Sequence, residues 1–289
     1  MLARTVRHVL QNRSFHTTPI CTTFWVKSKK QGYEKEQPLL PTKKMILEGL
    51  KDLKDEIIMW KEEVKEKLET DPILIYRPNE IDVYCRFNTR EEVEKWIVTS
   101  DSDHNEGYSR ANFELSTAGY GLFNGIVTAN LPKDGRIKKA GYASIRSQRH
   151  TKSFRRNTYY DWSTYNTLVL RVRGDGRPYM INIGTEGTFD VTWNDIYHFV
   201  LYTRGGPHWQ ITKIPFSKFI LASNGVVQDK QFPIPLNKIT SFGFAVSGRG
   251  GFDGPFSLEI DYVGLEYDPS NIEEFAYEMY KQEKYIVAT

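Results

Sequence analysis

The sequence predicts an all-β fold, a β-sandwich of jelly-roll type, with an amphipathic helix before it and a short helix after it. Two patterns support this prediction. Between residues 73 and 267, roughly seven or eight segments place apolar residues at every second position, with turns between them and no helical pattern. Residues 42–69 instead repeat apolar residues at three- and four-residue steps. With 39% hydrophobic residues among 289, the chain is long and apolar enough for a packed core.

The first thirty residues predict a mitochondrial transit peptide. They are rich in arginine, serine and threonine, and the first acidic residue of the chain is Glu34. Leu2, Val6 and Leu10 can share one face of a helix, as in transit peptides. The alternative interpretation is a disordered basic tail without a function.

The charge balance argues against nucleic-acid binding. The chain has 39 basic and 36 acidic residues, a net charge of +3, and six of the basic residues lie in positions 1–30. Without that segment, 33 basic residues remain against 36 acidic ones, a net charge of −3. The basic character therefore belongs to the presequence, and we expect no nucleic-acid partner.

Residues 31–72 are expected to hold a polar linker and the amphipathic helix. Thr42 is suited to the N-cap position, and Asp71-Pro72 ends the helical pattern. The helix either packs on the main domain or is offered to a partner. No apolar run approaches the length of a transmembrane helix, so we expect membrane association only through partners.

The segment 73–267 is the predicted sandwich domain. Segments 121–131 and 139–147 flank an Asp134-Gly135 turn and predict a hairpin. The last strand, 256–266, alternates most clearly. Its inward residues are predicted to be Phe256, Leu258, Ile260 and Tyr262, and its outward residues Ser257, Glu259 and Asp261. Further strands are predicted at 167–173, 177–184, about 195–203, 208–216 and 239–246.

Arg171 and Arg173 have the outward spacing of a strand, as do Glu259 and Asp261 on another. Opposite charges at matching spacing predict a ladder of ion pairs across the sheet rather than a pair of catalytic carboxylates.

The C-terminal segment 268–289 predicts a short helical tail. Ser270 and Glu273 have the spacing of a capping box, and apolar residues follow them.

The phrase "RVRGDGRPYM" around residues 173–179 predicts a tight hairpin turn between two strands. A dinucleotide fingerprint would need a third glycine where Tyr179 stands, and a phosphate-binding loop must open a helix rather than a strand. An adhesion role for Arg173-Gly174-Asp175 conflicts with the presequence. We expect Gly176→Val to destabilise the fold and Asp175→Glu to be tolerated.

Few residues suggest binding or catalysis. Asp101 and Asp103 offer hard oxygen ligands for calcium, although aspartate-rich turns are commoner than calcium sites. No nucleophile motif is present, and a hydrolase using Asp103, Glu186 or Glu259 lacks a defensible pairing. Three aromatic residues near loops predict either an interaction platform or closure of the ends of the core. They are Trp193, Tyr202 and Trp209.

Three phrases resemble one known family. They are "DWSTYNTLVLRVRGDGRPYMINI" (161–183), "HWQITKIPFSKF" (208–219) and "DGPFSLEIDYVGLE" (253–266). Together they resemble the complex I intermediate-associated protein family, and the likeness covers about residues 85–267. The family motif matches here in a turn whose implied role is structural. Its residues are Arg173, Gly174, Asp175, Gly176, Arg177 and Tyr179.

The resemblance implies a galactose-binding-like jelly roll and a chaperone role without catalysis or cofactor. Members support assembly of mitochondrial NADH:ubiquinone oxidoreductase (complex I). The implied partners are membrane-arm intermediates of complex I and other assembly factors, including an acyl-CoA dehydrogenase relative. The implied location is the matrix side of the inner membrane, reached through partners. The alternative hypothesis is a carbohydrate-binding module on the same sandwich.

Overall fold

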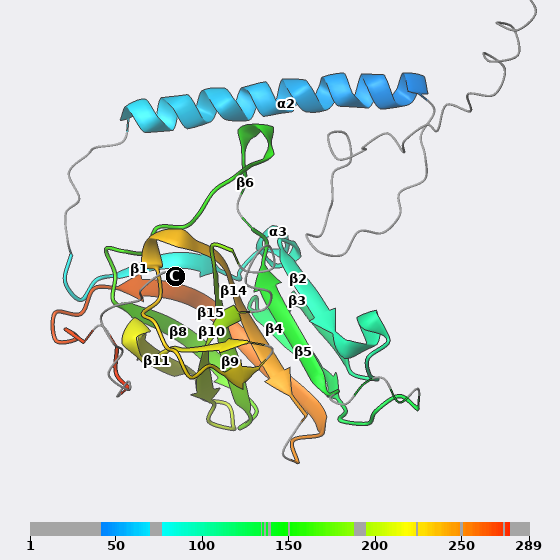
Figure 1. Ribbon diagram of the computed structural model, residues 1–289, viewed down its shortest axis with the longest axis vertical. Coiled ribbons are helices and arrows are strands. Elements are labelled where there is room, and N and C mark those ends of the chain that lie inside the picture. Colours follow the sequence, from blue (N-terminus) through cyan, green and yellow to red (C-terminus); the bar gives the residue numbers. More distant parts are fainter. Residues whose placement is uncertain are drawn as a thin grey trace, which may run out of the picture. The chain divides into compact units, whose positions relative to one another are not determined.

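The computed structural model describes residues 42–69, 77–133, 135, 137, 140–149, 151–187, 195–223, 225–248, 251–273 and 275–277 (Figure 1). The chain divides into two compact units, Met1–Lys61 and Glu62–Thr289. The predicted transit peptide and the polar linker up to residue 41 lie outside the described residues.

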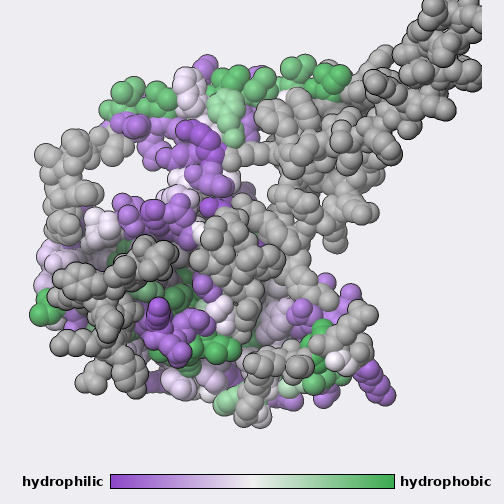
Figure 2. All heavy atoms as spheres, viewed as in Figure 1, coloured by the Kyte–Doolittle hydropathy of each residue, from purple (hydrophilic) through white to green (hydrophobic). Residues whose placement is uncertain are grey.

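The amphipathic helix predicted from apolar spacing is confirmed, because α2 spans Thr42–Glu69. The apolar side chains that the structure describes on this helix are exposed, and Figure 2 shows hydrophobic residues along it. They are Ile46, Leu50, Leu53, Ile57, Ile58, Met59, Trp60, Val64 and Leu68. Among the described residues, no helix combines the length and apolar character needed to cross a membrane.

The second unit holds a β-sandwich of jelly-roll type, built from two antiparallel sheets (Figure 1). In order across the first sheet, the strands are β11 (Gln210–Pro215), β8 (Thr167–Gly174), β15 (Gly254–Glu266), β4 (Gly121–Val127) and β3 (Arg110–Leu115), with β1 (Ile81–Arg86) also paired to β15. The second sheet contains β13 (Val226–Val227), β12 (Ile220–Ser223), β10 (Asp195–Tyr202), β9 (Pro178–Thr185), β14 (Ile239–Ser247), β5 (Tyr142–Ser147) and β2 (Trp96–Ser100).

Short elements connect these strands. They are α3 (Arg90–Glu94), the small hairpin of β6 (Thr151–Lys152) and β7 (Arg156–Asn157), and the 3₁₀ turns Asp101–His104, Ser153–Arg155, Phe216–Lys218 and Leu236–Lys238.

Aromatic rings fill the space between the sheets. Phe242 and Phe244 of β14 are fully buried, and their ring centroids lie 5.3 Å apart in an edge-to-face arrangement. Phe87 meets Trp96 in the same way at 5.0 Å. Each buried ring stabilises the fold by about 1.5–3 kcal/mol, which explains why alternating aromatic residues specify these strands.

β15 alternates as predicted only as far as Ile260. Its register with β8 shifts between Ile260 and Tyr262, which marks a β-bulge. Beyond the bulge, the large apolar side chains that are buried are those of Val263 and Leu265. The predicted inward position of Tyr262 is therefore wrong, because one extra residue in a strand reverses the faces that follow.

The hairpin predicted around Asp134-Gly135 is not formed. β4 pairs with β3 and β15 in the first sheet, whereas β5 pairs with β2 and β14 in the second. The intervening residues therefore pass from one sheet to the other. Gly135 has φ +70°, but a left-handed glycine serves a crossover as well as a hairpin.

The turn after β8 is also a crossover and not the predicted hairpin. β8 pairs with β11 and β15, whereas β9 pairs with β10 and β14. The turn at residues 175–177 thus joins opposite sheets of the sandwich.

The tail after β15 is not helical where the structure describes it, at residues 268–273 and 275–277. Instead of capping a helix, Ser270 donates from its backbone nitrogen to Asp268 Oδ1 at 2.9 Å. Asn166 holds this turn by donating to the carbonyl oxygens of Asp268 and Asn271 at 2.7 and 2.8 Å. These local side-chain bonds compete with helix formation, so the helix prediction is wrong for these residues. The remainder of the predicted helix lies outside the described residues.

Candidate functional site

The outer face of the first sheet carries a cluster of paired charges beneath an aromatic ring. Its residues, here called the ion-pair cluster, are Tyr120, Arg171, Arg173, Trp209, Glu259 and Asp261. β8 supplies both arginines and β15 both carboxylates, because these strands are hydrogen-bonded neighbours. Trp209 comes from the segment before β11, and Tyr120 from the residue before β4.

The ion-pair ladder predicted from strand spacing is confirmed. Arg173 lies opposite Glu259, and its Nε donates to Glu259 Oε2 at 2.8 Å. Arg171 pairs with Asp261, although the backbone partner of Arg171 is Tyr262. The bulge in β15 therefore presents Asp261 to the arginine. The hydrogen bond with Asp261 is also the main reason that the pKa of Arg171 is raised.

Trp209 covers both arginines. Its ring centroid lies 4.8 Å from Arg171 Cζ and 5.0 Å from Arg173 Cζ. Tyr120 meets the same indole edge-to-face, with centroids 4.6 Å apart. Arg173 Nη1 also donates to the carbonyl oxygen of Pro207 at 3.3 Å, which ties the loop that carries Trp209 to β8.

The cluster is suited to protein contact rather than to proton transfer. Its two arginines are balanced by two carboxylates, so it has no net charge. Both carboxylates accept hydrogen bonds from guanidinium groups, as in structural ion pairs. Trp, Tyr and Arg are the residues that dominate binding energy in protein interfaces.

The sequence pattern predicts most of this cluster but not Tyr120. The strand alternation revealed the charged residues, and Trp209 was singled out as an aromatic residue near a loop. Tyr120 precedes its strand, and nothing in the local sequence links it to Trp209, which is distant along the chain. Only the folded sheet brings the two rings together.

The other two predicted aromatic residues have different positions. Tyr202 ends β10 and is 74% exposed. Its carbonyl oxygen accepts from Gln210 Nε2 at 3.1 Å, so Tyr202 and Trp209 border the same loop. Trp193 lies outside the described residues.

The family-motif turn is a structural junction. Asp175 Oδ1 accepts from Arg177 N and from the Tyr179 hydroxyl, both at 3.1 Å. Asp175 Oδ2 accepts from the backbone nitrogen of Ser257 at 3.0 Å. Burial is the main cause that raises the pKa of Tyr179, and the Asp175 charge adds to it. One carboxylate thus joins the turn to β9 and β15.

Both glycines of the turn are required by geometry. A Cβ on Gly174 would lie 2.4 Å from the Thr203 side chain. Gly176 has φ +92°, where a β-branched residue is strained by about 1–3 kcal/mol. This geometry supports the expectation that Gly176→Val destabilises the fold.

The two calcium candidates are engaged in backbone hydrogen bonds. Asp101 is fully buried and accepts from Ser109 N at 2.7 Å, Ser109 Oγ at 3.0 Å and Gly141 N at 2.8 Å. Asp103 Oδ2 accepts from Ser100 N at 2.9 Å. Within the described residues, no three His, Cys, Asp or Glu side chains gather as metal ligands. The geometry gives both aspartates a structural role.

The remaining carboxylates considered for hydrolysis lie in separate networks. Glu186 accepts from the Tyr159 hydroxyl at 2.8 Å and pairs with Lys238, and these bonds lower its pKa. Glu259 belongs to the ion-pair cluster. The structure therefore does not bring these residues together with Asp103.

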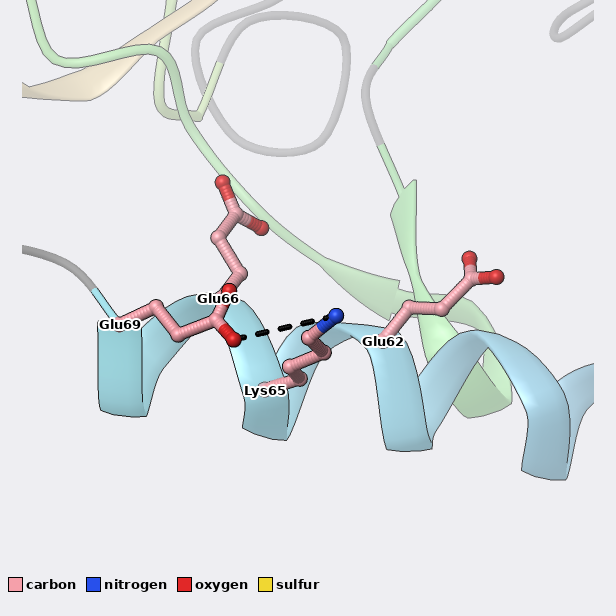
Figure 3. Close-up of a pocket in the computed structure, with 4 residues that line it drawn as sticks. All are labelled: Glu62, Lys65, Glu66 and Glu69. Carbon is pink, nitrogen blue, oxygen red and sulfur yellow. Dashed lines mark ion pairs between the residues drawn. The ribbon is translucent and has the colours of Figure 1, made fainter.

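A shallow pocket on α2 is part of the helix surface. Glu62, Lys65, Glu66 and Glu69 line it (Figure 3). Lys65 Nζ lies 3.8 Å from Glu69 Oε1, and both side chains are exposed. An exposed pair of this spacing stabilises a helix by about 0.3–0.5 kcal/mol and implies no ligand.

A second pocket lies at one end of the sandwich. It has a volume of about 360 Å³ and is lined by residues from segments 163–166, 216–217, 233–236 and 267–273. No sequence motif predicted it, because these segments become neighbours only after folding.

Comparison with known proteins identifies similar chains. Residues 85–260 match the family model described as Complex I intermediate-associated protein 30. A relative from Drosophila melanogaster named "Complex I intermediate-associated protein 30, mitochondrial" is 60% identical over 277 residues, which are 96% of this chain and 94% of the relative. A Mus musculus relative of the same name is 45% identical over 68% of this chain and 59% of its own length.

Solved structures are similar at a lower level. A family 11 carbohydrate-binding module from Clostridium thermocellum, in complex with a β-1,3-1,4-mixed-linked tetrasaccharide, matches 65% of this chain and 96% of its own. The sequence identity is 16% and the TM-score 0.44.

Proposed function

This chain belongs to the complex I intermediate-associated protein 30 family, and from that premise we propose that it is a mitochondrial assembly factor. It binds intermediates of NADH:ubiquinone oxidoreductase (complex I) and supports their assembly without catalysing a reaction. In this proposal the intermediates bind to the surface of the protein rather than in an enclosed active site.

One observation links the family to a place on the structure. The three phrases that resemble the family each supply part of the ion-pair cluster. Residues 161–183 contain both arginines, 208–219 contain Trp209, and 253–266 contain both carboxylates. The pairing of β8 with β11 and β15 brings these distant phrases together. We therefore assign the contact with assembly intermediates to the outer face around Trp209.

The chemistry of this face favours a protein partner over a glycan. Sugar recognition combines an aromatic platform with polar groups that bind hydroxyls. Beside Trp209, the polar groups of the ion-pair cluster are engaged with one another, as Arg173 with Glu259 and Arg171 with Asp261. An apolar or aromatic group of a protein can contact the indole without breaking these pairs.

Membership of the family supports two finer proposals, one on location and one on partners. We propose that the protein acts on the matrix side of the inner membrane and reaches the membrane through its partners. We also propose that it works with other assembly factors, among them an acyl-CoA dehydrogenase relative. Protease protection in mitoplasts, together with affinity purification and mass spectrometry, tests both proposals.

The main function is tested by removing the protein from cells. We expect depletion of assembled complex I on native gels, restoration by the wild-type chain, and no NADH oxidation by the purified protein. An unchanged amount of assembled complex I in cells that lack the protein would contradict the proposal.

A further inference from the structure

The pocket at the end of the sandwich, here called the tail pocket, has an apolar floor. Phe216 and Ile234 are 6% and 9% exposed, and Leu236 packs beside them against the core. Ile272 stands at the rim with 87% of its surface exposed. A volume of about 360 Å³ is within the range of ligand pockets, about 300–1,000 Å³.

Hydrogen bonds hold the wall of the tail pocket in place. Asn166 donates to the carbonyl oxygens of Asp268 and Asn271, and its Oδ1 accepts from Asp268 N at 2.8 Å. Asn271 Nδ2 in turn donates to Thr167 Oγ1 at 3.2 Å. The wall is therefore formed before a ligand arrives, which reduces the entropy that binding must overcome.

Three carboxylates that do not themselves line the tail pocket are hydrogen-bonded to side chains that do. The Tyr165 hydroxyl donates to Asp82 at 2.7 Å, the Ser163 hydroxyl to Asp161 at 2.6 Å, and Asn271 Nδ2 to Asp268 at 3.0 Å. Glu273 itself lines the pocket. Three of the polar side chains that line the pocket therefore each donate a hydrogen bond to a carboxylate.

Three basic groups near the pocket pair with carboxylates that do not line it, and Arg77 with Glu80 is one of these pairs. None of the lining residues is a lysine or arginine. Lys213 pairs with the buried Glu266 at 2.6 Å, and Lys238 pairs with Glu186. Lys218 follows the lining residue Ser217 and is exposed. The opening therefore combines an apolar floor with an acidic rim.

We propose that the tail pocket binds an extended segment of a protein partner in which a leucine-like side chain stands next to lysine or arginine. The apolar side chain fills the floor over Phe216 and Ile234, and the basic group meets the carboxylates of the rim. This inference rests on the proposed assembly role, since it adds a second contact surface to the ion-pair cluster.

The test uses the full chain and two labelled peptides in a glycine-serine background. One carries Leu-Arg-Leu at its centre and the other Leu-Glu-Leu. By fluorescence anisotropy at low salt, we expect the basic peptide to bind at least tenfold more tightly. Ile272→Lys and Glu273→Lys should each weaken it about tenfold, whereas the matched surface variants Val227→Lys and Glu91→Lys should change it less than twofold. Equal binding of both peptides, no binding of either, or unchanged binding to the rim variants would overturn the inference.

Rescue of cells that lack the protein separates the two proposals. Failure of the wild-type chain to restore complex I counts against the assembly role whatever the peptides do. Full restoration by the wild-type chain and by both rim variants, without discrimination between the peptides, counts against the tail pocket alone.

Discussion

The indole of Trp209 lies over the guanidinium group of Arg171, with the ring centroid 4.8 Å from Cζ. The same ring covers Arg173 and contacts Tyr120, so truncating it removes several weak interactions at once. We expect Trp209→Ala to lower the free energy of unfolding by about 1.5–3.5 kcal/mol, because it removes two cation–π pairs of about 0.5–1 kcal/mol each and one aromatic pair of about 0.5–1.5 kcal/mol. Urea unfolding of the purified protein measures this.

The same substitution tests the assigned interface. An anchor of a protein interface contributes about 2 kcal/mol or more, equivalent to roughly a 30-fold loss of affinity. We expect Trp209→Ala to lose co-purifying complex I intermediates while remaining folded, and Trp209→Phe to retain part of them. Undiminished co-purification with Trp209→Ala would place the interface elsewhere.

Asp175 is expected to tolerate less change than its sequence context implied. Its carboxylate accepts from Arg177, Tyr179 and Ser257, and a longer side chain displaces the oxygens from these donors. We expect Asp175→Glu to cost roughly 1 kcal/mol of stability and Asp175→Ala more, because the hydrogen bonds to Asp175 are exposed or partly buried and each contributes about 0.5–1.5 kcal/mol. Thermal unfolding compares these with Asp229→Glu, an exchange in a different loop. A melting temperature for Asp175→Glu equal to that of the wild-type protein would contradict this prediction and support the sequence-based expectation that the substitution is tolerated.

The sequence was sufficient to predict the fold class and most strands, because burial of one sheet face imposes alternation on each strand. Strand partners were harder to predict. The glycines at 135 and 176 do lie in turns, as expected, yet both turns cross between sheets. A tight turn needs the same residue types whether it leads to a neighbouring strand or to the opposite sheet, so local chemistry does not distinguish the two.

The candidate site was predictable where it depends on strand periodicity. Matching spacings of charge predicted the pairing of Arg173 with Glu259. The bulge that brings Asp261 to Arg171 depends on packing around one inserted residue, which no alternation pattern reveals. The tail pocket could not be predicted from the sequence for a similar reason, since its walls come from four separate segments of the chain.

Asp101 is expected to stabilise the fold without a metal. It is fully buried and accepts three hydrogen bonds from Ser109 and Gly141. We expect Asp101→Ala to cost about 3 kcal/mol or more, since it leaves those donors unsatisfied. Differential scanning fluorimetry with and without a calcium chelator should show no change for the wild-type protein. A chelator that lowers the melting temperature, and calcium that restores it, would instead support a calcium site.

His198 is expected to make stability depend on pH between about 6.5 and 4. Burial lowers its folded-state pKa from 6.5 to about 4. Its Nδ1 lies 2.6 Å from Asn182 Oδ1, where a neutral imidazole can donate. Because the unfolded chain binds a proton near pH 6.5 and the folded chain only near pH 4, the unfolded state takes up more protons in that window. The contribution of the neutral His198 to the free energy of unfolding is therefore fully present above pH 6.5. It is lost as the pH falls toward 4, by about 3 kcal/mol.

Carboxylates such as Glu186 and Asp268, whose pKa values are lowered, add their own loss of stability toward lower pH. The effect of His198 must therefore be isolated as a difference between two proteins. We expect the free energy of unfolding of wild type minus that of His198→Gln, measured by urea titration at a series of pH values, to fall between pH 6.5 and 4. A difference that stays constant over this range would mean that His198 takes up its proton equally well in the folded chain, and that burial on the outer face of β10 does not exclude the charged imidazole.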